Sequence, residues 1–131
     1  MANPIDAPTV RYKMDPRDVV PFIQFISRGD SEDDHLQSGQ EIASYTLVPS
    51  ATGAAALLQV MEGDGRDPAL VDDDPDANPR LGFWLCLDPS MWPNPMFDGQ
   101  GYVAGVETTV VTTDDPPQTK QFSLLVNIRN K

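Results

Sequence analysis

The sequence has 131 residues, enough for a single domain, and its hydrophobic share of 40% allows only a modest core. Thirteen prolines and nine glycines interrupt the chain so often that a helical bundle is excluded. Twenty acidic residues against nine basic ones give a net charge of −11. This balance disfavours nucleic acids and anionic membranes as partners, because both attract lysine and arginine.

Three features of the sequence predict where the protein is made. Cys86 is the one cysteine and cannot form an intramolecular disulfide. The residues Met1–Asp6 lack the basic and apolar segments of a signal peptide. No apolar run approaches the ~20 residues that a transmembrane helix needs. We therefore expect synthesis in a reducing, intracellular compartment and no membrane segment.

The N-terminal residues 1–17 are polar and contain three prolines, a pattern that predicts an extended arm. The folded domain is then expected in residues 18–131. Its first predicted strand is Val19–Ile26, where Pro21 indicates an edge strand or a bulge. The core candidates in this strand are Phe22, Phe25 and Ile26.

Strands and polar loops alternate through the middle of the chain. Arg28–Ser38 has no apolar period and is predicted to be a loop, whereas Glu41–Val48 alternates as a strand does. Ala54–Met61 has helix propensity, but it lies between two glycines and is short, so we predict a strand. Glu62–Asn78 is an acidic insertion with seven acids and one base.

The C-terminal half carries the clearest strand patterns. Leu81–Leu87 is continuously apolar, which predicts a central strand buried on both faces. Tyr102–Thr113 alternates, Asp114–Gln118 is a turn, and a second alternating strand follows to Ile128, so the two form a long antiparallel hairpin. The predicted fold is a single-domain, all-β antiparallel sandwich of immunoglobulin-like size.

The acidic insertion contains the pattern closest to a metal site. Asp72, Asp74, Asp76 and Asn78 occupy alternate positions, as in a calcium loop. An EF-hand also needs glycine at its sixth position and glutamate at its twelfth, and the insertion supplies neither. We predict a solvated acidic loop, with a weak cation site of another type as the alternative.

The sequence offers no convincing catalytic group. His35 is the one histidine, and Cys86 lies in the middle of an apolar strand, where cysteine usually acts as a small buried hydrophobe. A nucleophilic pair of these two residues is the less favoured interpretation. We expect no enzyme activity, no catalytic or metal site and no cofactor.

The irregular segment around Trp92 allows two interpretations. Its large apolar side chains could close one end of the sandwich, or some of them could anchor a neighbouring subunit. The proline-rich arm could likewise order on a partner. The predicted partner contacts are Pro89, Met91, Trp92, Met96 and Phe97 in this segment, and Pro4, Pro8, Val10 and Tyr12 in the arm.

A series of short motifs resembles a known family. The motifs are Lys13-x-Asp15-Pro16-x-Asp18, Leu36-x-x-Gly39-Gln40-x-Ile42-Ala43-Ser44, Phe83-Trp84-Leu85, Gly101-Tyr102-Val103 and Val110-Val111-Thr112-Thr113. Their order resembles the small virion proteins of tailed bacteriophages known as fibre–tail adaptors, over roughly residues 13–129. The chain departs from that pattern by three insertions and by phenylalanine in place of the usual tryptophan near the first strand.

The resemblance implies a non-enzymatic subunit that is made in the host bacterial cytoplasm and assembled, in several copies, into the virion. The leading hypothesis is an adaptor that seats tail fibres or spikes on the tail or neck and contacts other virion proteins. Removing the Trp92 segment should then abolish assembly but not folding. A capsid decoration protein is the close alternative. A carbohydrate- or calcium-binding module is the third, with a sugar platform of Trp84, Trp92 and Tyr102.

Overall fold

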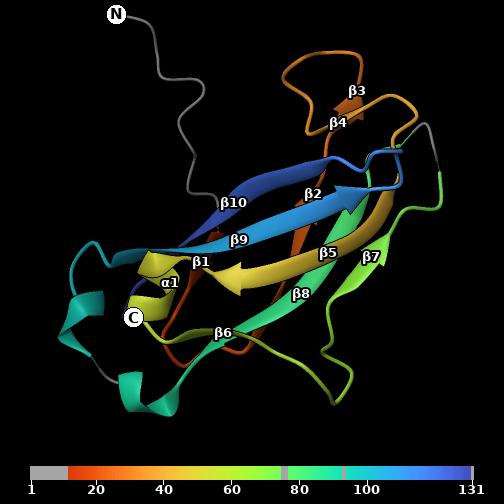
Figure 1. Ribbon diagram of the computed structural model, residues 1–131. Helices are drawn as coiled ribbons and strands as arrows, with labels where there is room; N and C mark the ends of the chain where they lie inside the picture. The colour runs from red at the N-terminus through yellow and green to blue at the C-terminus, as the bar shows by residue number, and fades with distance from the viewer. Residues whose placement is uncertain (1–11, 75–76, 93, 131) are drawn as a thin grey trace, which may run out of the picture.

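Two four-stranded sheets face each other in the computed structural model, which describes residues 12–74, 77–92 and 94–130 (Figure 1). The strands are β1 (Tyr12–Met14), β2 (Val20–Phe25), β3 (Arg28–Gly29), β4 (Leu36–Gln37), β5 (Ile42–Pro49), β6 (Leu58–Val60), β7 (Ala69–Val71), β8 (Arg80–Leu87), β9 (Tyr102–Thr112) and β10 (Thr119–Ile128). The helical segments are α1 (Ala51–Ala55) and the 3-10 turns η1 (Pro89–Met91) and η2 (Pro95–Phe97). The predicted all-β sandwich is confirmed.

The first sheet has the order β1-β10-β9-β5 and is built on the C-terminal hairpin. In that hairpin Tyr102 lies opposite Ile128 and Val111 opposite Thr119, so the predicted long antiparallel pairing is confirmed. Strand β5 pairs antiparallel with β9 and matches the predicted strand at residues 41–48. Strand β1 pairs in parallel with β10 at the other edge.

The second sheet is centred on β8, as the sequence predicts. All six residues of β2, Val20–Phe25, pair with one edge of β8. The other edge is shared, because β6 pairs with the end of β8 at Leu85–Leu87 and β7 pairs with its beginning at Arg80–Gly82. Strand β2 is an edge strand among the described residues, and this position tolerates Pro21.

The strand order is that of an immunoglobulin-like sandwich. The seven main strands, counted along the chain, are β1, β2, β5, β6, β8, β9 and β10. The third, sixth and seventh of them (β5, β9 and β10) lie in one sheet, and the second, fourth and fifth (β2, β6 and β8) form the other. The first strand, β1, joins the sheet of the last one. The disulfide that joins the two sheets in antibody domains is excluded here, because the chain has one cysteine.

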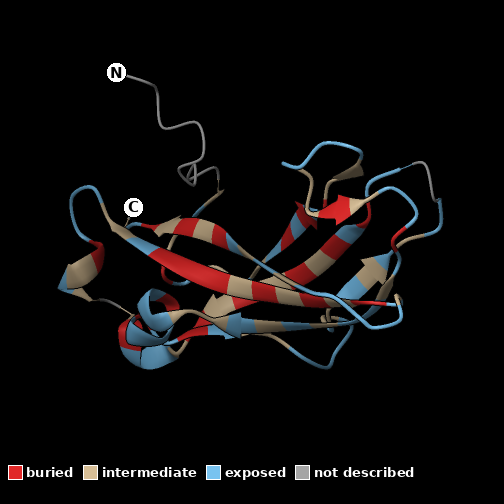
Figure 2. Cartoon of the chain, turned by 45° about the horizontal axis from the view of Figure 1, so that its top comes forward, coloured by how far each residue is buried: buried red, intermediate tan, exposed pale blue. Residues whose placement is uncertain are grey.

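The core lies between the two sheets and follows the alternation of the strands. Along β8 and β9, buried residues alternate with more exposed ones (Figure 2). The fully buried set includes Phe83, Leu85, Val106 and Val126. The prediction that β8 is buried on both faces is wrong, since Gly82, Trp84 and Cys86 point to the half-buried outer side.

The alternation also corrects the predicted core of the first strand. Phe22 and Ile26 are buried, but Phe25 is 59% exposed. Residues three apart in a strand lie on opposite faces, so Phe22 and Phe25 cannot both point inward.

The predicted arm and two other segments differ from the structure. Residues 12–14 of the arm form β1, and Met14 is buried in the core. The predicted strand at residues 54–61 is confirmed only at β6, since Ala54 and Ala55 belong to α1, whose N-cap Ser50 accepts a hydrogen bond from the Gly53 N–H. The predicted loop at residues 28–38 contains a small parallel pair, β3 with β4. No helix in the described parts of the chain is long and apolar enough to span a bilayer.

Candidate functional site

The outward side of the second sheet carries an apolar surface, which we call the β2–β8–β7 face. It consists of Pro21, Ile23 and Phe25 on β2, Arg80, Gly82 and Trp84 on β8, and Ala69 and Val71 on β7. These residues are the non-core members of their strands, because the alternate residues of β2 and β8 are buried between the sheets.

Strand register sets the layout of this face. Phe25 and Val71 both lie opposite Arg80, on either side of it. Two residues further along β8, on the same side of the sheet, Gly82 lies between Ile23 and Ala69 in the same way. Gly82 has no side chain, and a Cβ placed there would meet no atom closer than 3.9 Å, so the centre of the face is open.

The apolar side chains of the face are exposed to solvent. Phe25 is 59% exposed, Ile23 is 53% exposed and Val71 is 38% exposed. Trp84 is half-buried, and the Arg66 guanidinium lies 5.2 Å from its ring centroid, within reach of a cation–π contact. The sequence contained a signal for this face, because apolar residues occur at both sets of alternating positions in Val19–Ile26 and therefore on both sides of the predicted strand.

One end of the face meets the acidic insertion. A hollow of about 430 Å³ lies there, and its lining includes Phe25, Val71 and Arg80 of the face together with Asp73 and Asn78 of the acidic insertion. The exposed aliphatic and aromatic groups therefore have an acidic border.

Arg28 holds this border in place. Its guanidinium donates to both carboxylate oxygens of Asp72, at 2.9 and 2.8 Å, and to the carbonyl oxygens of Asp74 and Ala77. Its backbone N–H donates to Asn78 Oδ1 at 3.0 Å. The side chain of Arg28 is only 4% exposed, so the loop closes around a buried cation that belongs to the chain itself.

These contacts bear on the calcium hypothesis. Two of its proposed ligands, Asp72 and Asn78, are engaged by Arg28, and Asp76 lies outside the described residues. No group of three or more His, Cys, Asp or Glu side chains within the described ranges is placed to hold a metal ion.

His35 and Cys86 have different neighbours. His35 stacks on Phe122 with ring centroids 4.3 Å apart, and its Nδ1 accepts a hydrogen bond from the Ser27 N–H. Burial lowers the pKa of His35, and the nearby Asp34 carboxylate partly opposes that effect. Cys86 lies on β8 beside Gln59, and burial raises the pKa of its thiol. A raised pKa disfavours the thiolate, the form that acts as a nucleophile.

The Trp92 segment closes one end of the sandwich. Phe97 is fully buried and Met91 is 8% exposed, so these two predicted partner contacts belong to the core of the domain. Trp92 and Met96 are half-buried and pack against the same core, whereas Pro89 is exposed. Because these side chains complete the core, we now expect removal of the segment to destabilise the folded domain as well as to affect assembly.

Tyr12 is the one predicted arm contact that the structure describes. Its ring packs edge-on against Phe22, with centroids 5.3 Å apart, and its hydroxyl donates to the Ile23 carbonyl at 3.0 Å. Tyr12 thus joins the β1 and β2 edges of the two sheets. The other predicted arm contacts, Pro4, Pro8 and Val10, lie outside the described residues.

The structure does not bring the proposed sugar platform together. Trp84 points outward from β8, whereas Tyr102 packs on the buried Phe97 and donates its hydroxyl proton to the Thr52 carbonyl. Trp92 packs against the core at the end of the sandwich. The three aromatic rings therefore do not share one exposed surface.

Comparisons with protein families, with curated proteins and with solved structures found no match to this chain.

Proposed function

We propose that this protein is a non-enzymatic structural subunit of a tailed bacteriophage particle, and that it docks on another virion protein through the β2–β8–β7 face. The role favoured by the sequence resemblance is an adaptor that seats fibres or spikes on the tail or neck. The observation that carries the docking role is the exposure of Ile23 and Phe25, at 53% and 59%, side by side on one sheet. Large exposed apolar patches are rare on monomeric proteins and mark interaction sites.

The chemistry of the face defines the partner. Its centre would accept an apolar surface, since Gly82 leaves room between Ile23 and Ala69. Its border carries the exposed Asp73, and the whole chain has a net charge of −11. A partner with lysine or arginine around an apolar patch is complementary, and a second copy would place like charges together. This favours a different virion protein.

The test uses particles purified from the phage or lysogen that carries this gene. The double variant Ile23→Ser/Phe25→Ser should fold with an unchanged melting temperature but be missing from the particles. The matched control is Val48→Ser/Val103→Ser, which removes two valines that are 49% and 40% exposed on the first sheet. The control should be incorporated as the unchanged chain is.

Two results would overturn parts of the proposal. Particles that never contain the chain would rule out a virion subunit. Normal incorporation of the Ile23→Ser/Phe25→Ser variant would rule out this face as the docking surface. Capsid decoration is distinguished by where labelled copies sit, since a decoration protein covers the shell and an adaptor is confined to the tail or neck.

A further inference from the structure

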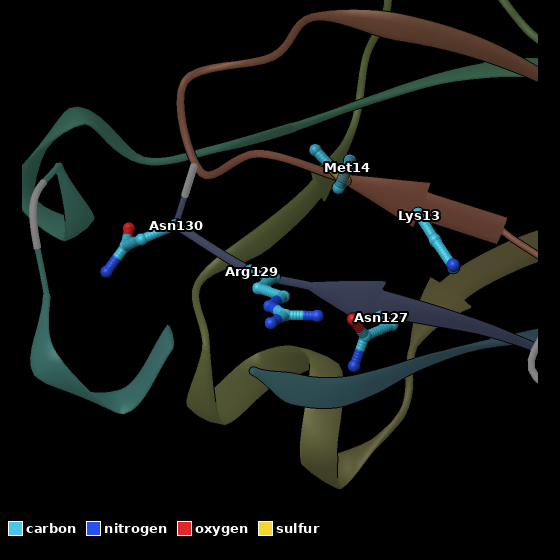
Figure 3. Close-up of a pocket in the computed structure, with 5 residues that line it drawn as sticks. All are labelled: Lys13, Met14, Asn127, Arg129 and Asn130. Atoms are coloured by element: carbon cyan, nitrogen blue, oxygen red, sulfur yellow. The ribbon is translucent and has the colours of Figure 1, made fainter. Parts of the chain in front are cut away.

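A pocket of about 410 Å³ lies where β1 and β10 of the first sheet end (Figure 3). Its lining residues are Lys13, Met14, Asn127, Arg129 and Asn130.

Strand pairing explains why two basic residues line this pocket. In the parallel pair of β1 and β10, Lys13 lies opposite Asn127. Arg129 follows two residues later, so it points to the same side of the sheet as Asn127. The Arg129 N–H donates to the Met14 carbonyl at 3.0 Å, which extends the pairing by one step and fixes the backbone of Arg129 beside β1.

Neither cation at this pocket is neutralised within the described chain. The one ion pair found among the described residues joins Arg28 to Asp72, at the other end of the sandwich. The side chains of Lys13 and Arg129 are both exposed and make no hydrogen bond to a described residue. Two like charges around one pocket repel each other, and an anion between them would remove that repulsion.

The amides of the pocket limit what an anion could contact. Asn127 Nδ2 donates to the Gln100 carbonyl at 3.1 Å. Asn130 Nδ2 donates to Asp98 Oδ1 at 2.6 Å. Asn130 Nδ2 also donates to the Asn94 carbonyl at 3.3 Å, so both of its protons are used, whereas Asn127 keeps one amide proton for a ligand. The charged contacts to a ligand come from Lys13 and Arg129.

We propose that this pocket binds a carboxylate, held by the Arg129 guanidinium and the Lys13 ammonium. The planar guanidinium matches a carboxylate with two parallel hydrogen bonds. A singly charged group is favoured over a phosphate dianion, because the Asp98 carboxylate is close and the chain carries a net charge of −11. The pocket has room for more than a carboxylate, so the ligand is a small organic acid or the C-terminus of a peptide.

The experiment is a titration of the full, isotope-labelled chain followed by amide NMR at constant ionic strength. The probes are acetate, N-acetylglycine as a mimic of a peptide C-terminus, and inorganic phosphate. Acetate and N-acetylglycine should cause saturable shifts confined to residues 13–14 and 127–130. Binding of N-acetylglycine at least about tenfold tighter than acetate identifies a peptide C-terminus as the ligand, and equal binding identifies a free acid.

A pair of variants with the same net charge tests the assignment. Lys13→Gln/Arg129→Gln should weaken carboxylate binding by about a hundredfold, because it removes two charge-assisted contacts. The control Lys120→Gln/Arg80→Gln removes two positive charges elsewhere and should leave binding within about twofold. Both variants are first checked for an unchanged melting temperature.

The proposal fails if no saturable shift appears by about 50 mM carboxylate, or if both variants bind equally well. Phosphate binding as tight as carboxylate binding would overturn the preference for a single charge. These outcomes do not depend on the proposed docking face, since the probes are small molecules and the readout is local.

Discussion

Thr108 on β9 donates a hydrogen bond to Gln24 Oε1 on β2, at 2.9 Å, across the interior of the sandwich. Thr108 is fully buried and Gln24 is 8% exposed. The two residues belong to different sheets, so this bond joins the layers in a core that has no disulfide. It joins the second and sixth main strands, which the disulfide joins in antibody domains.

The first prediction concerns this bond. Thr108→Val keeps the shape of the side chain but removes its hydroxyl, so the Gln24 oxygen stays buried without that donor. We expect a loss of about 1–3 kcal/mol in the free energy of unfolding. The double variant Thr108→Val/Gln24→Leu should recover most of the loss, because it removes both polar groups. Urea unfolding of the two single variants and the double variant gives the coupling energy. Losses that simply add would show that the two side chains are not energetically coupled and would contradict this prediction.

The second prediction concerns Arg28. Arg28→Ala leaves the Asp72 carboxylate, 16% exposed, without its partner, and should cost about 3–5 kcal/mol of unfolding free energy. Arg28→Lys should recover only part of this, because one ammonium cannot donate to Asp72, as Nη2 of Arg28 does, and also to the Asp74 and Ala77 carbonyls, as Nη1 does. Arg80→Ala, at an exposed position of β8, should change stability by no more than about 0.5 kcal/mol. Equal stability of Arg28→Ala and the unchanged chain would contradict the role of Arg28.

The third prediction concerns pH. Burial holds the pKa of His35 in the folded chain below its ordinary value of 6.5, and Nδ1 must be unprotonated to accept from the Ser27 N–H. The unfolded chain therefore takes up this proton first as the pH falls. The resulting stabilisation is present above pH 6.5 and is lost as the pH falls from there through the lower folded pKa.

The measurement compares the unchanged chain with His35→Gln between about pH 5 and pH 8, in the range where histidine titrates. The difference in unfolding free energy should shrink towards the acid end, because glutamine does not titrate. A difference that stays constant over this range would mean that His35 does not contribute to the pH dependence.

The fourth prediction concerns the Trp92 segment. Phe97 is fully buried and packs near Tyr102, with ring centroids 6.4 Å apart, so Phe97→Ala should cost about 3–5 kcal/mol of unfolding free energy. Pro89→Ala, at an exposed position of the same segment, serves as the control and should change stability by about 0.5 kcal/mol or less. A small effect of Phe97→Ala on the free energy of unfolding would contradict this prediction and favour the interpretation that the segment contacts a partner.

The sequence by itself determined the all-β class, the C-terminal hairpin and the central position of β8. Those strands have strong local patterns, with alternation over Tyr102–Thr112 and a continuous apolar run in β8. Such patterns depend only on the two-residue period of a strand and on the burial of one face. The edge position of β2 could also be predicted from the sequence, because Pro21 has no N–H to donate to a neighbouring strand.

Only the tertiary structure decided which apolar residues are core and which are surface. Phe25 and Phe97 are both phenylalanines in apolar segments, yet one is 59% exposed and the other fully buried. Phe25 is exposed because it lies on the outward side of β2. Phe97 is buried because the segment that follows β8 folds over the end of the sandwich. The contacts of Arg28 with Asp72 and the pairing of Lys13 with Asn127 join residues far apart in the sequence. No local pattern encodes these contacts, because they arise only when the strands take their places in the two sheets.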